Sequence, residues 1–243
     1  MLKMCIISSA EDNILMRFID SLQYVKVDYH CYILRNRQTA VESKENVTIH
    51  VVDKNEYIKK EGIQLLKLRI ESIELAEPEE NDIIMLGDDD MYFQENVDFN
   101  FINILGIDIE FIAARTFPRP LVWESCKHVG IHRGHYFRYK QEIWNFIKSK
   151  YIECVGGGED GLIACMHYKY NKGKSLEINL PGVVHAGGNS YAYYNKLQDE
   201  SSISYLLKFG EDFSLSTYDR ALIQKFEEIK DSLTPPQQQS IVR

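Results

Sequence analysis

The hydrophobic positions of the N-terminal part of the chain alternate between the period of strands and the period of helices. Apolar and β-branched runs predict strands at Lys3–Ser8, Tyr29–Leu34, Val47–Val52 and Asp82–Leu86. Helical spacing predicts helices over Ile14–Val25 and Ile63–Ala76, the second ending before Pro78. Strands that alternate with helices predict an α/β domain with a mostly parallel central sheet flanked by helices.

Weaker patterns continue into the second half of the chain. We expect strands at Phe111–Ala114, Ser175–Leu180 and Val183–Val184, and helices at Arg138–Lys148, Leu162–Tyr170 and Tyr218–Leu233. A length of 243 residues suits a single α/β domain. We therefore expect one domain over residues 1–233 and a flexible tail over 234–243, which reads TPPQQQSIVR from Thr234 onward.

Charge is divided unevenly along the chain. The formal net charge of -8 argues against a generally basic nucleic-acid-binding surface. Ile70–Ala114 contains no Lys or Arg, whereas Arg115–Lys140 is rich in both. An acidic segment that holds a metal, followed by a basic one, would suit a metal-bound phosphate substrate. The alternative is that the cations are spread over a solvated surface.

Cysteine usage and hydropathy bear on location. The five cysteines are scattered and show no CxxC spacing, which favours reduced thiols over a disulfide framework or a zinc site. No apolar run approaches the roughly 20 residues of a transmembrane helix. The segment MLKMCIISSA is soon interrupted by Glu11 and Asp12, which is not typical of a signal peptide. We therefore expect a cytoplasmic protein.

The most informative motif is NDIIMLGDDDMYF, an apolar run that ends in Asp88, Asp89 and Asp90. Three adjacent carboxylates repel one another, so a fold that places them at a strand end usually supplies a cation to neutralise them. Mg²⁺ and Mn²⁺ prefer oxygen ligands of this kind. A solvated acidic turn is the structural alternative.

A second motif, VGGGEDG, places glycines directly before Glu159 and Asp160. Consecutive glycines cost backbone entropy and add no packing, which is easier to understand if Gly157 and Gly158 move or approach a ligand closely. The alternative is an ordinary helix start, where the dipole favours carboxylates.

A third motif, LPGVVHAGGNS, places His185 at the end of an apolar stretch. A lone histidine near a core is commonly a hydrogen-bonded structural residue. A chain that carries paired aspartates, however, needs further ligands for its ion, and an imidazole at another strand end can supply one.

The order of a βαβ start, LGDDDMYF, GGGEDG and VVHAGGNS resembles a metal-dependent glycosyltransferase of the GT-A fold, from the first strand to about Tyr194. The resemblance implies a single-domain, Rossmann-like GT-A fold. It implies that Asp88, Asp90 and His185 bind Mn²⁺ or Mg²⁺. It also implies hexosyl transfer from a nucleotide-diphosphate sugar, with a UDP-sugar favoured, to an acceptor hydroxyl with inversion.

The same resemblance assigns further roles. Asp160 would be the catalytic base, paired with Glu159. Small polar residues at strand ends and a cation on the helix before the Asp strand fall where such enzymes contact the donor. The expected donor-binding residues are Ser8, Ser9, Asp53, Arg69, Asp88 and Asp89.

The acceptor is expected along Phe117–Lys140, where aromatic residues and cations are interleaved. The expected acceptor-binding residues are Trp123, Arg133, His135, Gly157 and Gly158. For any one of these aromatic residues the alternative is core packing. A glycan or a phosphate-bearing molecule would fit, as would a hydroxymethylated base in DNA, the acceptor of phage-type DNA glycosyltransferases. A nucleotidyltransferase and a non-catalytic sugar-nucleotide binder remain the alternatives from other classes.

Overall fold

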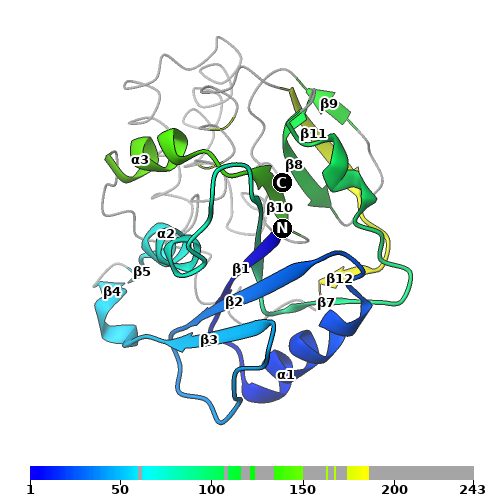
Figure 1. Cartoon of the computed structure of the whole chain (residues 1–243). Helices are drawn as coiled ribbons and strands as arrows, with labels where there is room; N and C mark the ends of the chain where they lie inside the picture. The colour runs from blue at the N-terminus through cyan, green and yellow to red at the C-terminus, as the bar shows by residue number, and fades with distance from the viewer. Residues whose placement is uncertain are drawn as a thin grey trace, which may run out of the picture.

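The computed structural model describes residues 1–59, 62–106, 109–115, 121–123, 134–149, 163, 167 and 174–185. Most of these residues belong to strands or helices (Figure 1). The helices are α1 (Asp12–Ser21), α2 (Leu65–Leu75) and α3 (Gln141–Ser149). The strands are β1 (Leu2–Ser8), β2 (Tyr29–Arg35), β3 (Val47–Val51), β4 (Ile58–Lys59), β5 (Gly62–Ile63), β6 (Ile83–Asp88), β7 (Met91–Phe93), β8 (Ile109–Arg115), β9 (Leu121–Trp123), β10 (His135–Arg138), β11 (Lys174–Asn179) and β12 (Val183–His185).

The central sheet has 8 strands in the order β3-β2-β1-β6-β10-β8-β11-β9. Strands β3, β2, β1 and β6 pair in parallel, as do β8 and β11. Strand β10 runs antiparallel to both β6 and β8, and β9 runs antiparallel to β11. The sheet is therefore mixed, and the expected parallel arrangement is confined to its N-terminal half and to the β8-β11 pair.

Helices α1 and α2 cover opposite faces of the parallel half of the sheet. Leu15 and Phe18 of α1 pack in the main hydrophobic cluster with Met4 of β1, which points to one face. Leu68 of α2 packs in a second cluster with Leu34 of β2, on the other face. Burial on both faces explains why these strands read as nearly continuous apolar runs.

A small second sheet forms next to the aspartates. Strand β6 ends at Asp88, a turn follows at residues 89–90, and β7 leaves that turn. Strand β12 pairs antiparallel with β7, so that His185 lies opposite Met91. This register places the end of β12 beside the Asp turn (Figure 1).

Several element boundaries differ from the prediction. The first expected helix divides into α1 and a 3₁₀ turn at Leu22–Tyr24. The expected helix at Arg138–Lys148 begins only at Gln141, because Arg138 ends the unpredicted strand β10. Within the described ranges, no helix is long and apolar enough to cross a membrane. The expected helix at Tyr218–Leu233 and the tail at 234–243 lie outside the described residues.

Candidate functional site

Polar side chains gather at one edge of the sheet. Because β3, β2, β1 and β6 are parallel, their carboxyl ends lie on the same edge. Ser8 ends β1, Arg35 ends β2 and Asp88 ends β6, while Asp53 follows β3. Ligands of open α/β sheets bind at this kind of edge. The predicted position of the Asp motif at a strand end is thus the position that the structure gives it.

Asp90 and His185 are in direct contact. Their Oδ2 and Nε2 atoms are 3.3 Å apart, and the two side chains are 18% and 20% exposed. The pairing of β12 with β7 produces this contact, because His185 is opposite Met91 and Met91 directly follows Asp90. Two residues that are distant in sequence therefore present a carboxylate and an imidazole together at the sheet edge.

Asp88 is held by the buried Arg69 of α2. The Arg69 guanidinium donates one hydrogen bond of 2.6 Å to the Gly87 carbonyl and another of 2.6 Å to Asp88 Oδ1. Burial raises the pKa of Asp88, and the negative charge of Asp90 raises it further, while Arg69 acts in the opposite direction. Arg69 was expected to reach a donor diphosphate. Its buried guanidinium neutralises and orients Asp88, and the contact with a diphosphate stays a prediction.

Asp89 turns inward, away from its two neighbours. It is buried, accepting a hydrogen bond of 2.5 Å from the Ser8 hydroxyl and one of 3.2 Å from the Ala10 N–H. Burial raises its pKa to about 6, although these two hydrogen bonds lower it. Asp89 and Ser8, both expected to contact the donor, are thus engaged with one another in the protein interior.

The remaining donor-binding predictions fall on the same edge. Ser9 is exposed directly after β1. Asp53 is exposed after β3, and its Oδ1 accepts a hydrogen bond of 2.9 Å from the Asn55 N–H at the start of a 3₁₀ turn. Through this bond Asp53 caps the 3₁₀ turn. Its contact with a donor ribose stays a prediction.

The donor chemistry of the site suits a divalent cation. Two adjacent ligands of an octahedral Mg²⁺, each about 2.1 Å from the metal, lie about 3 Å apart. The 3.3 Å between Asp90 Oδ2 and His185 Nε2 is close to that separation. Among the described residues, however, no three His, Cys, Asp or Glu side chains form a ready-made metal site. Asp90 and His185 thus fit one ion as a pair, and Asp88 could join them through Oδ2 while Arg69 binds its Oδ1.

The acceptor predictions are placed differently. His135 is fully buried in β10, with its ring 4.9 Å from that of Phe111, so it packs in the core instead of lining an open acceptor site. Trp123 ends the edge strand β9, opposite Ser175 of β11. Other predicted residues lie outside the described part of the chain, namely Arg133, Gly157, Gly158, Glu159 and Asp160.

Local patterns gave no indication of one residue of the site, Arg35. It is a fully buried cation whose Nη1 donates a hydrogen bond of 2.6 Å to the Ser8 hydroxyl. The signal that could have found it is its position as the last residue of a strand beside the Asp strand, where an acidic cluster needs neutralising charge.

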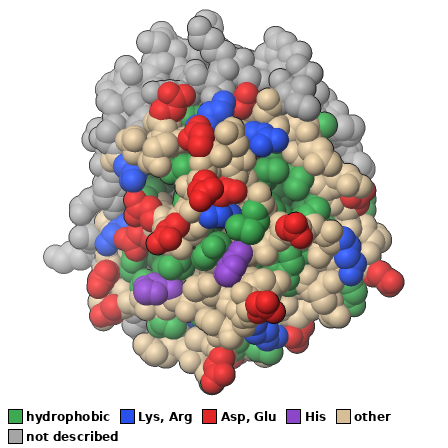
Figure 2. Space-filling view, in the orientation of Figure 1, with side chains coloured by type: hydrophobic (Ala, Val, Ile, Leu, Met, Phe, Trp, Pro, Cys, Tyr) green, Lys and Arg blue, Asp and Glu red, His purple; other side chains and the backbone are tan. Residues whose placement is uncertain are grey.

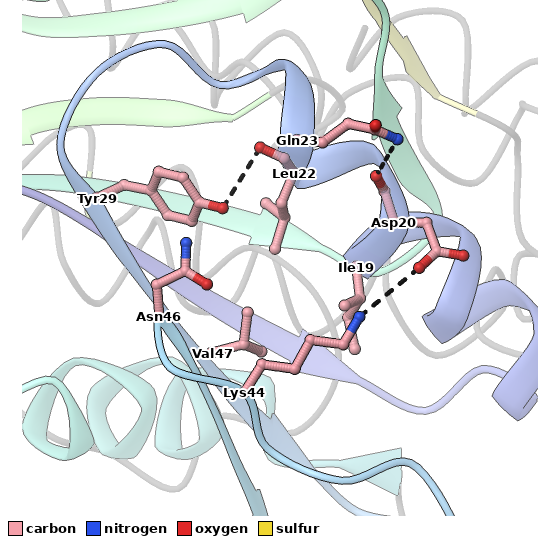
Figure 3. A pocket seen from close by; sticks show the side chains of 8 residues that line it. All are labelled: Ile19, Asp20, Leu22, Gln23, Tyr29, Lys44, Asn46 and Val47. Carbon is pink, nitrogen blue, oxygen red and sulfur yellow. Dashed lines mark hydrogen bonds and ion pairs between the residues drawn. The ribbon is translucent and has the colours of Figure 1, made fainter.

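A cavity of about 490 Å³ lies away from this site (Figure 3). It is lined by Tyr29 and Val47, which begin β2 and β3, and therefore lies at the opposite edge of the sheet from Asp88. Lys44 and Asp20 form an exposed ion pair of 3.8 Å at its rim. The cavity is consequently separate from the carboxylate and histidine cluster.

The described residues define an α/β protein with a mixed sheet and an Asp-His cluster at the carboxyl edge of its parallel strands. No protein-family model matches the chain, and no curated protein matches it in sequence. Among solved structures, the nucleoside-diphosphate-sugar pyrophosphorylase from Vibrio cholerae RC9 is similar, with a TM-score of 0.42 and 9% identity over 80% of this chain and 99% of that one. Function is therefore argued from the site.

Proposed function

We propose that this protein is a metal-dependent glycosyltransferase that moves a sugar from a nucleotide-diphosphate sugar, with a UDP-sugar favoured, to an acceptor hydroxyl. The contact between Asp90 and His185 carries the proposal, since it joins two of the three sequence motifs at the sheet edge where α/β proteins bind ligands. Asp88, at the end of the neighbouring parallel strand β6, is the third member of this site.

In this proposal Asp88, Asp90 and His185 hold Mn²⁺ or Mg²⁺, which would supply Lewis-acid stabilisation of the departing diphosphate, an effect of several kcal/mol. Arg69 keeps Asp88 at the sheet edge through its hydrogen bonds of 2.6 Å to Asp88 and to Gly87. The site therefore combines acidic ligands with a fixed buried cation that prevents their mutual repulsion from displacing them.

The acceptor hydroxyl must lose a proton as it attacks the anomeric carbon. We assign this proton to Asp160, with Glu159 beside it in the GGGEDG motif. A positioned base typically contributes about a hundred- to ten-thousand-fold in rate. Direct attack assisted by such a base inverts the configuration of the anomeric carbon.

A glycan or a phosphate-bearing acceptor suits the surface better than duplex DNA. Acidic and basic side chains are interspersed among the described residues of the face shown in Figure 2, and the chain has a formal net charge of -8. Contact with long DNA usually requires an extended basic surface. Transfer to hydroxymethylated bases in DNA remains the second acceptor class, and steep weakening of binding as salt rises would identify it.

The test is to incubate the protein with UDP-, GDP- and CMP-sugars in the presence of Mn²⁺ and to identify the products by mass spectrometry. We expect release of UDP from a UDP-sugar, at a rate that Asp90→Asn greatly lowers. Asp20→Asn is the matched control, because Asp20 is an exposed aspartate at the distant cavity. In a parallel incubation with a nucleoside triphosphate and a sugar phosphate, release of pyrophosphate would instead identify a nucleotidyltransferase. Binding of sugar nucleotides with no turnover would identify a non-catalytic binder.

A further inference from the structure

Arg35 lies at the centre of a buried hydrogen-bond network behind the Asp turn. Its side chain is fully buried, and its two terminal nitrogens reach three acceptors. Nη1 donates to the Ser8 hydroxyl at 2.6 Å, while Nη2 donates to the Ala10 carbonyl at 2.8 Å and to Asp12 Oδ1 at 2.7 Å. A buried cation of this kind is stable only with such partners.

The network leads directly to Asp89. The Ser8 hydroxyl, which accepts from Arg35, donates in turn to Asp89 Oδ2 at 2.5 Å. Arg35 Nη1 itself is 3.9 Å from the same carboxylate oxygen. The Ala10 N–H donates to Asp89 as well, so the carbonyl and the amide of one residue bind the two charged groups. Arg35, Ser8 and Ala10 therefore hold Asp89 in the interior.

The position of Asp89 constrains its two neighbours. Asp88 ends β6 and Asp90 belongs to the turn before β7, so Asp89 connects the residues that face the sheet edge. Asp89 is buried, whereas Asp88 remains 37% exposed and Asp90 18% exposed. If Asp89 left the interior, the backbone of this short turn would rotate and the side chains of Asp88 and Asp90 would move with it.

We propose that Asp89 is not a metal ligand and that Arg35 is a positioning residue, which acts through Ser8 and Asp89 to keep Asp88 and Asp90 facing the substrate side of the sheet edge. This inference rests on the proposed function for its metal-binding consequence. Arg35 also joins the loop after β2 to the site, because its partner Asp12 accepts hydrogen bonds from the Thr39 hydroxyl and the Ala40 N–H.

The first experiment measures Mn²⁺ affinity by calorimetry in Arg35→Lys, Asp89→Asn and the double variant. Outer residues that orient ligands typically change metal affinity by about 10- to 100-fold, so we expect Arg35→Lys to weaken binding about tenfold. If Arg35 acts through Asp89, the double variant will bind no more weakly than the weaker single variant. The proposal would be overturned if the losses of Mn²⁺ affinity in the two single variants multiplied in the double variant. It would also be overturned if Asp89→Asn lost as much Mn²⁺ affinity as Asp90→Asn.

The second experiment compares crystal structures of the wild-type protein and Arg35→Lys without metal. We expect Asp89 to leave Ser8 in the variant and the contact between Asp90 and His185 to open. An unchanged turn would overturn the positioning role. If the wild-type protein binds no Mn²⁺, the proposed function fails, while this structural comparison still decides the role of Arg35. Ser8→Ala, a smaller change that removes the connecting hydroxyl, replaces Arg35→Lys in both experiments if that variant does not fold.

Discussion

His185 Nε2 lies 3.3 Å from Asp90 Oδ2 because β12 pairs with β7, in a register that sets His185 opposite Met91. The sequence motifs that contain these residues are far apart, and neither indicates the pairing by itself. The small β7-β12 sheet is thus the element that assembles the candidate site, and its buried residues Met91, Phe93 and Val183 belong to the main hydrophobic cluster.

Gly182 directly precedes β12 and lies close to the backbone of Val97. Its φ is +80°, and a Cβ there would lie 2.5 Å from the Val97 nitrogen and 2.7 Å from the Val97 Cα. We expect Gly182→Ala to destabilise the protein by about 1–3 kcal/mol and to weaken Mn²⁺ binding as β12 shifts. Chemical denaturation and calorimetry measure the two effects. Gly106→Ala, at a φ of +81° beside the Arg138 side chain, is the control that should lose stability and retain Mn²⁺ affinity.

Arg69→Lys tests how Asp88 is held. Lysine keeps the positive charge but cannot bind the Gly87 carbonyl and Asp88 with a planar fork, as Arg69 does at 2.6 Å to each. We expect a loss of about 1–3 kcal/mol in the free energy of unfolding and about tenfold weaker Mn²⁺ binding. Arg17→Lys, on an exposed arginine 3.7 Å from the centre of the Tyr92 ring, should change neither quantity greatly. Equal effects of the two substitutions would contradict the role of Arg69.

Buried His167 predicts how stability depends on pH. Its ring centre is 4.1 Å from that of Phe137, and among the described residues neither ring nitrogen has a hydrogen-bond partner. Burial, chiefly, lowers its pKa from 6.5 to about 3. Between about pH 3 and pH 6.5 the unfolded chain binds a proton at this histidine that the folded protein does not bind. The free energy of unfolding is therefore highest above pH 6.5 and falls as the pH is lowered through this range.

His167 is expected to lower the free energy of unfolding by about 1.4 kcal/mol for each pH unit well below pH 6.5. We expect His167→Phe to reduce the difference in unfolding free energy between pH 7 and pH 5, as measured by urea denaturation at both values. His50→Phe is the control, because His50 is an exposed residue of β3. An identical pH dependence in wild type and His167→Phe would contradict the assignment.

Asp160→Asn separates catalysis from metal binding. If Asp160 is the general base, the amide will slow sugar transfer by about a hundred- to ten-thousand-fold while Mn²⁺ and donor affinity stay near those of the wild type. Single-turnover kinetics with the donor identified in the product screen gives the rate. Undiminished transfer would remove Asp160 from this role, and loss of metal binding would make it a ligand instead.

Local periodicity predicted the parallel half of the sheet because each of its elements carries its own signal. Strands β1, β2 and β6 are apolar runs that are buried on both faces, and α1 presents Leu15, Phe18 and Ile19 on one stripe. Strand β10 was missed for the opposite reason. His135–Arg138 is short, and its place between β6 and β8 depends on long-range antiparallel pairing that no local pattern encodes.

The candidate site likewise has a part that the local sequence predicts and a part that depends on tertiary contacts. The Asp motif at a strand end was predictable from a run of apolar residues followed by carboxylates, and its position at the carboxyl edge is confirmed. The inward orientation of Asp89 was not, because it depends on Ser8 and on the buried Arg35, which come from two other strands. Neighbouring aspartates with the same side chain thus acquire different environments only through tertiary contacts.

Pulsed EPR of Mn²⁺ bound to the wild-type protein and to His185→Ala tests the central claim most directly, with Asp20→Asn as the control. We expect tight binding with hyperfine coupling to one imidazole nitrogen in the wild type and in Asp20→Asn. His185→Ala should lose that coupling and bind Mn²⁺ about 10- to 100-fold more weakly. Mn²⁺ bound without nitrogen coupling in the wild type, or bound equally well by His185→Ala, would contradict a metal site built from Asp88, Asp90 and His185.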